Sequence, residues 1–150
     1  MRPLLALTFA ALLAAGCKTV EFGSGNPDVT PSDTGTAEIL FANRLDKDGG
    51  AVAFLLFGAT AENVDAAIPV STLATVAVNQ TATAKVPAGR WKIGYEEESK
   101  DRHSMPADSI GGSPDWPVVV IAKGGSYGLA LETDEGGVTI WRNDLPAVSP

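Results

Sequence analysis

The chain has a single cysteine and a single histidine among its 150 residues, and only 7% of the residues are aromatic. One thiol cannot form an intrachain disulfide, so an apolar core alone has to hold the fold together. One histidine, His103, excludes a zinc site built from several histidines. His103 lies in a polar stretch of sequence, and we expect it to be exposed.

Basic residues are also scarce. Lys and Arg total 11 against 18 Asp and Glu, and the formal net charge is −7. Proteins that bind nucleic acid use Lys and Arg to neutralise phosphates, and this chain has no basic cluster. The composition therefore argues against a nucleic-acid partner, and equally against docking on anionic lipid head groups.

Two sequence signatures of catalysis are missing as well. There is no phosphate-binding P-loop and no Ser-x-x-Lys motif, so we expect neither an enzyme nor a cofactor. Two arrangements would contradict this expectation. One is a glycosidase-like carboxylate pair at Glu96 and Glu98; the other is a cluster of Glu96, Asp134 and Arg142 in one cleft. The simpler interpretation of 96–98 is a charged strand end that discourages edge pairing.

The N-terminus has the three parts of an export signal. Arg2 supplies a positive charge, and residues 4–15 are apolar apart from Thr8. The end of this run and the next residue, 14–16, are all small. The apolar run is too short to span a membrane, which takes about 20 residues. Ordinary secretion or a buried helix would also accommodate this segment.

The run Ala15-Gly16-Cys17 resembles the lipobox of bacterial lipoproteins, in which Leu is followed by small residues and then Cys. The first lipobox position is Ala14 here, with leucine one place earlier. The resemblance implies that residues 1–16 are removed and that Cys17 carries acyl chains such as palmitate. Lys18 follows the cysteine in place of Asp, as is typical of lipoproteins sent to the outer membrane. The resemblance thus implies a lipid-anchored envelope protein, on either face of that membrane.

Composition divides the remaining chain into three parts. Residues 17–36 are rich in Gly, Ser, Pro, Thr and Asp, as expected for a flexible linker. Short β-branched and aromatic runs separated by turn residues extend over 37–145, and a tail covers 146–150. We expect strands at 37–45, 51–58, 72–78, 81–86, 90–97, 117–122, 126–132 and 137–142. This pattern predicts a single antiparallel β-sandwich of seven or eight strands.

Glycine-containing turns join these runs at 46–50, 86–89, 123–125 and 134–137, and we expect them to form hairpin connections. The sequence Val86-Pro87-Ala88-Gly89 with Trp91, Ile93 and Tyr95 resembles a hairpin of transthyretin-like and carboxypeptidase-regulatory-like β-sandwiches. This resemblance covers about ten residues and implies a fold, with no catalytic residue. Residues 59–70 form either a short helical turn or a loop.

The turn at 46–50 also holds the weak metal candidates Asp46 and Asp48, whose spacing resembles the start of a calcium loop. The later ligands of such a loop are missing, so a plain acidic turn is the simpler interpretation. If the turn at 134–137 lies at the same end of the sandwich, the two turns could share an ion.

A long polar segment, 99–115, carries Met105 and Ile110 and ends at Trp116. Loops of this length in compact domains are often functional. We expect a non-enzymatic accessory or adaptor protein that binds another envelope protein through this loop or a sheet edge. The alternative is a carbohydrate- or small-ligand-binding module that uses Trp91, Trp116 or Trp141 as a stacking surface.

Overall fold

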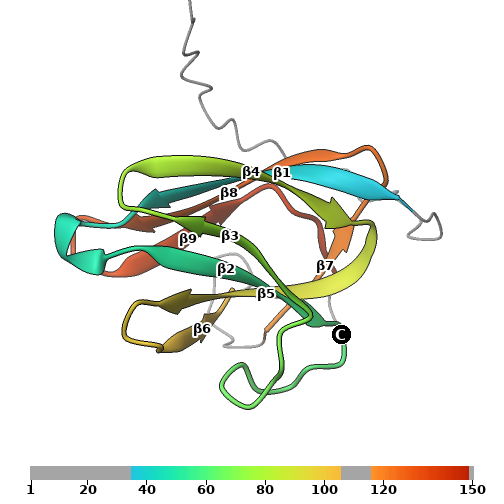
Figure 1. Cartoon of the computed structure of the whole chain (residues 1–150), viewed down its shortest axis with the longest axis horizontal. Coiled ribbons are helices and arrows are strands. Elements are labelled where there is room, and N and C mark those ends of the chain that lie inside the picture. The colour runs from blue at the N-terminus through green and yellow to red at the C-terminus, as the bar shows by residue number, and fades with distance from the viewer. Residues whose placement is uncertain (1–34, 106–115, 149–150) are drawn as a thin grey trace, which may run out of the picture.

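The computed structural model describes residues 35–105 and 116–148, which form ten strands packed as two facing sheets (Figure 1). The predicted all-β sandwich is confirmed. In chain order the elements are β1 (Thr36–Arg44), the 3₁₀ turn η1 (Lys47–Gly49), β2 (Val52–Gly58), β3 (Ser71–Val76), β4 (Gln80–Pro87), β5 (Gly89–Glu97), β6 (Arg102–Ser104), β7 (Val118–Ile121), β8 (Ser126–Thr133), β9 (Thr139–Asn143) and β10 (Ala147–Val148).

The first sheet, sheet A, has the strand order β4-β1-β8-β9. Its two central strands, β1 and β8, pair in parallel from Glu38 opposite Ser126 to Arg44 opposite Glu132. The other two pairs of this sheet are antiparallel. The expectation of a purely antiparallel sandwich is therefore wrong at the centre of sheet A.

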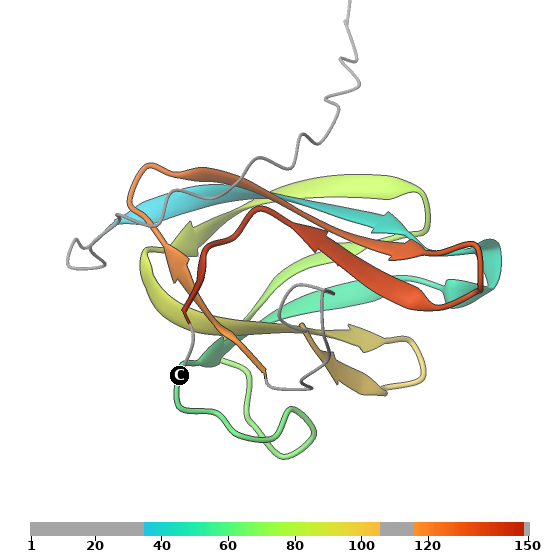
Figure 2. The same ribbon diagram turned by 180° about the vertical axis from the view of Figure 1, so that it is seen from behind.

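The second sheet, sheet B, has the order β10-β7-β5-β2-β3, with β6 also paired to β5. One side of β5 pairs with β2 along seven residues. Its other side is divided, because β7 pairs with residues 89–91 and β6 with residues 94–96. The break between β6 and β7 therefore lies opposite Trp91 to Gly94, at the lower edge of the sandwich in both views (Figure 2).

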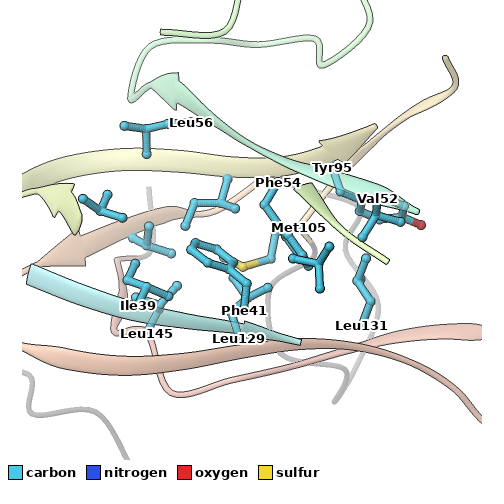
Figure 3. Close-up of a cluster of buried hydrophobic side chains, with 14 of the residues drawn as sticks. Ile39, Phe41, Val52, Phe54, Leu56, Tyr95, Met105, Leu129, Leu131 and Leu145 are labelled. Carbon is cyan, nitrogen blue, oxygen red and sulfur yellow. The ribbon is translucent and has the colours of Figure 1, made fainter. Parts of the chain in front are cut away.

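The core lies between the sheets and comes from alternate residues of facing strands (Figure 3). Ile39 and Phe41 of β1 face Phe54 and Leu56 of β2, and all four side chains are fully buried. The rings of Phe41 and Phe54 have centroids 4.8 Å apart. Burying one such side chain contributes roughly 1.5–3 kcal/mol, so this core can hold the fold without a disulfide.

Each of the eight expected strands forms, and two further strands appear where the sequence indicated a loop and a tail. β6 pairs Arg102–Ser104 with β5, and β10 pairs Ala147 with Val119 and Val148 with Val118. Both strands are too short to show an alternating pattern. The sandwich thus includes residues expected to lie beyond it, and β1 already begins at Thr36.

Three of the four expected hairpins are instead connections between the two sheets. The turns at 46–50, 86–89 and 123–125 each leave one sheet and enter the other. The turn at 134–137 does join neighbouring antiparallel strands, β8 and β9. The fragment that resembles a transthyretin-like hairpin is therefore a corner between sheets.

Candidate functional site

A second, smaller apolar cluster lies on the outer face of sheet B, beneath the loop of residues 59–70. Its buried members are Leu55, Phe57 and Trp116. The rings of Phe57 and Trp116 meet edge to face with centroids 4.8 Å apart. The loop residues packed on this cluster are Ala61, Val64 and Ala67. Residues 59–70 form a loop with no assigned helix, and this loop contains one turn closed by a hydrogen bond from Ala67 N–H to the carbonyl of Asn63, four residues earlier.

Two basic side chains of sheet B hold this loop in place. The Nζ of Lys92 donates to the carbonyl of Ala61 and lies 5.3 Å from the centre of the Trp116 ring. Arg102 donates to the carbonyl of Ala67 at 3.1 Å and forms an ion pair with Glu96 at 2.8 Å. Hydrogen bonds from Arg102, with its charge and that of Lys100, keep the pKa of Glu96 below its usual value.

Backbone hydrogen bonds fix the loop further. Ala67 N–H donates to the carbonyl of Asn63 at 2.8 Å, and Val70 N–H donates to the carbonyl of Leu56 at 2.7 Å. The Asn63 side chain accepts from Asp65 N–H at 2.9 Å, which is an Asx turn. The loop is therefore a structured element of the domain.

Gly94 of β5 allows the close approach of this loop. A Cβ at this position would lie 2.7 Å from the carbonyl oxygen of His103 and 3.2–3.3 Å from side-chain atoms of Phe57 and Val64. A side chain larger than hydrogen would therefore separate β6 from β5 or lift the loop from the sheet.

The outer side of the loop is apolar and exposed. Ile68 is 89% exposed and Val70 is 59% exposed, and Pro69 lies between them. Val138, in the turn between β8 and β9, is the third large exposed hydrophobic residue of the described chain. The loop extends from the lower side of sheet B in Figures 1 and 2, whereas the Val138 turn lies at an end of the sandwich.

The predicted binding residues Met105 and Trp116 are both buried, Met105 between the two sheets and Trp116 beneath the loop of residues 59–70. Met105 is 1% exposed and lies among the core side chains between the sheets (Figure 3). Trp116 is 8% exposed, and its Nε1 donates to the carbonyl of Ile93 at 2.7 Å. Neither side chain offers a surface for a ligand in this arrangement. Cys17, Ile110 and residues 17–34 of the expected linker lie outside the described residues.

Trp91 has a local structural contact at the corner between β4 and β5. Its Nε1 donates to the carbonyl of Pro87 at 2.9 Å, so the indole folds back over the turn. Gly89 in that turn has φ of 139°, a conformation that L-residues rarely adopt. The half-buried indole of Trp91 is therefore engaged by its own turn.

Trp141 belongs to an aromatic group at one end of the sandwich. Its ring lies 5.3 Å from that of Tyr95, which stacks on His103 at 4.7 Å. His103 is exposed as expected, and its Nε2 lies 3.4 Å from a carboxylate oxygen of Glu97. Burial, with the charge of Glu97, raises the pKa of Tyr95 to about 12 despite a side-chain hydrogen bond with Thr139.

The acidic turns lie at this same end of the sandwich. Asp46 N–H donates to Thr133 Oγ1 at 3.0 Å, which places the 46–50 turn beside the 134–137 turn. Within residues 35–105 and 116–148, no three His, Cys, Asp or Glu side chains are grouped closely enough to hold a metal ion. Asp134 instead accepts the backbone N–H groups of Gly136 and Val138.

The three residues of the enzyme alternative make separate contacts. Glu96 pairs with Arg102, Asp134 caps its own turn, and Arg142 pairs with Glu132 on sheet A. Glu132 also accepts from Arg44 at 2.8 Å. Burial alone would raise the pKa of Glu132, but hydrogen bonds from the two arginines outweigh it and lower the pKa.

One serine has the spacing of a nucleophile elbow without its structure. Gly124, Ser126 and Gly128 match the Gly-x-Ser-x-Gly pattern. That motif requires a sharp turn from a strand into a helix. Ser126 instead follows a connection between two strands and is the first residue of β8.

Comparison with known proteins gives no family: no protein-family model matches the chain, and no curated protein matches it. Within the described residues, no helix has the length and apolar character needed to cross a bilayer.

Proposed function

We propose that the chain is a lipid-anchored accessory protein that binds another protein of the cell envelope. Acylation at Cys17 would hold it at the outer membrane, and the segment 17–36 would link the anchor to the sandwich. The lipobox-like sequence supports the anchor. The exposed Ile68 and Val70 on a structured loop support the binding role.

The single observation that carries the binding role is the high exposure of Ile68. An isoleucine left in water forgoes roughly 1.5–3 kcal/mol that its burial would contribute. Isolated exposed hydrophobic residues are common on protein surfaces, but this one is held by a loop with many fixed contacts. A preformed loop loses little conformational entropy on binding, which favours association.

The experiment is site-specific photo-crosslinking of the full, membrane-anchored chain in cells. A photoreactive residue replaces Ile68 in one variant and Val138 in the matched control. We expect position 68 to capture one envelope protein in an amount close to that of the chain itself. Position 138 should not capture this protein. Failure to capture a protein from position 68 at expression matched to the control would contradict the proposal.

A second candidate function is small-ligand binding at the aromatic group. The observation that favours it is the partly exposed Trp141 beside Tyr95, with Glu97 close to His103. Aromatic faces next to carboxylates suit stacking with sugar rings. A glycan array probed with the full chain in detergent tests this function. Binding that is lost in Trp141→Ala and kept in Trp91→Ala would support it.

A further inference from the structure

We propose, building on the proposed function, that the loop inserts Ile68 and Val70 into an apolar pocket of a partner protein whose rim carries Lys or Arg. We use the name acidic-apolar face for four residues of this loop: Glu62, Asp65, Ile68 and Val70. All four residues are exposed.

The charge of this face is the first argument. Glu62 and Asp65 are both exposed carboxylates. The turn closed by the Ala67 N–H bond to Asn63 carries Asp65 between its ends, so the loop backbone sets the position of Asp65. The face therefore presents two negative charges within the same structured loop as the apolar pair.

The two basic side chains that contact this loop are directed to other groups than these carboxylates. Lys92 is directed to the carbonyl of Ala61 and the ring of Trp116. Arg102 is directed to the carbonyl of Ala67 and the carboxylate of Glu96. Two cations thus hold the loop through its backbone carbonyls, and both carboxylates of the loop are exposed. A complementary surface would be apolar at its centre and basic at its rim.

The same charges disfavour two other occupants. A second copy of the chain would bring two acidic faces together, and like charges facing one another cost binding energy. An anionic lipid surface would repel the two exposed carboxylates of this loop. A basic-rimmed protein pocket is the occupant that uses both the apolar and the charged residues.

The test measures binding kinetics between the full chain in detergent and the purified protein captured from position 68. Ile68→Asp should weaken binding at least tenfold, chiefly through faster dissociation. The double variant Glu62→Lys, Asp65→Lys should slow association by about tenfold at low salt, and the difference should shrink at high salt. The matched controls lie in the turn between β8 and β9, where both residues are exposed. Glu135→Lys is the control for the charge reversals, and Val138→Asp is the control for Ile68→Asp.

Each outcome separates this inference from the proposed function. If Ile68→Asp weakens binding but the charge reversals leave association unchanged or faster, the basic rim is wrong and the binding role stands. If the captured protein binds all variants equally, the face is not the docking site. Adducts from position 68 that contain only a second copy of the chain, or only phospholipid, would overturn the inference. Capture of nothing would overturn the proposed function itself.

Discussion

The indole Nε1 of Trp116 donates a hydrogen bond to the carbonyl oxygen of Ile93 at 2.7 Å, and this contact completes the divided edge of β5. The same oxygen accepts the backbone N–H of Met105 at 2.9 Å. Residues 105 and 116 are thus fixed to one point of sheet B. The Trp116 ring packs on Phe57 and also supports the loop of residues 59–70.

We expect Trp116→Ala to lower the free energy of unfolding by about 3–5 kcal/mol, since a large buried ring is lost. Trp116→Phe should cost less, because a phenylalanine ring can keep much of the packing on Phe57 that alanine loses. Chemical denaturation measures both losses, and hydrogen exchange at Ala67 and Val70 should accelerate most in the alanine variant. A loss under about 1 kcal/mol for Trp116→Ala would contradict this role.

Asn43 offers a sharper test, because it is the fully buried polar residue of the core. Its amide nitrogen donates to the carbonyls of Gly50 and Val76, each at 3.0 Å. Asn43→Asp would place carboxylate oxygens against those two acceptors. We expect a loss of about 3 kcal/mol or more at neutral pH that shrinks in acid as the introduced carboxylate is protonated.

The control for this variant is Asn143→Asp. The Asn143 side chain accepts from Leu145 N–H at 3.2 Å, as Asn43 accepts from Leu45 N–H. A carboxylate preserves that acceptor, and Asn143 is only partly buried. Thermal unfolding at pH 7 should therefore show a small change for Asn143→Asp. Equal losses for the two variants would show that the donor contacts of Asn43 are unimportant.

Asp144 should give a pH-dependent gain of stability when it is neutralised. Burial raises the pKa of Asp144, opposed by its hydrogen bond from Gly128 N–H. The native state therefore holds this proton more tightly than the unfolded state, and stability falls as pH rises through the native pKa. Asp144→Asn keeps the acceptor for Gly128, so we expect a higher Tm at pH 7 and no gain below the unfolded value of about 3.9.

Glu132→Gln is the comparison of opposite sign. The pKa of Glu132 is lowered, so its ionised form stabilises the fold above the unfolded pKa, and this stability is lost as pH falls through the native pKa. Glu132→Gln should lower Tm at pH 7 and differ least from the parent chain in acid. Melting curves with the same sign for both variants would refute the assignment.

Gly94 should tolerate no side chain, although β-strands usually favour β-branched residues. We expect Gly94→Ala to cost about 1–3 kcal/mol and Gly94→Val to cost more, since the added atoms meet the His103 backbone. Gly58→Ala is the matched control, because nothing lies within 4 Å of a Cβ there. Denaturation midpoints of the three variants measure these losses. A Gly94→Val variant as stable as the parent chain would exclude the predicted clash.

The sequence predicts the strands well because some of them alternate between buried and exposed residues and the others are short apolar runs bounded by turn residues. Ile93 and Tyr95 of β5 are buried, and the charged Lys92 and Glu96 on either side of the pair are only partly buried, as their pattern indicates. The pattern could not predict β6, because Arg102–Ser104 contains no apolar residue and is a strand only through its pairing with β5. The turn before it places Lys100 at φ of 72°, which no glycine signals in the sequence.

The connections between sheets could not be predicted from their turns. A glycine-rich turn suits a hairpin and a sheet-to-sheet corner alike, and the strands beside the 46–50 turn are both largely buried. The loop of residues 59–70 did carry a signal. Ala61, Val64 and Ala67 recur at every third position, and these are the residues that contact the outer face of sheet B. The exposure of Ile68 depends on tertiary packing and had no such signal.

The parallel pairing of β1 with β8 joins parts of the chain that are far apart in sequence, as in the contact between Arg44 and Glu132, 88 residues apart. The central pair of sheet A therefore cannot form until most of the domain has been synthesised. Such distant pairing slows folding. On a chain that emerges from its N-terminus, β1 can pair with β4 while its other edge stays open until β8 arrives, a period in which a chaperone that covers exposed strand edges would matter most.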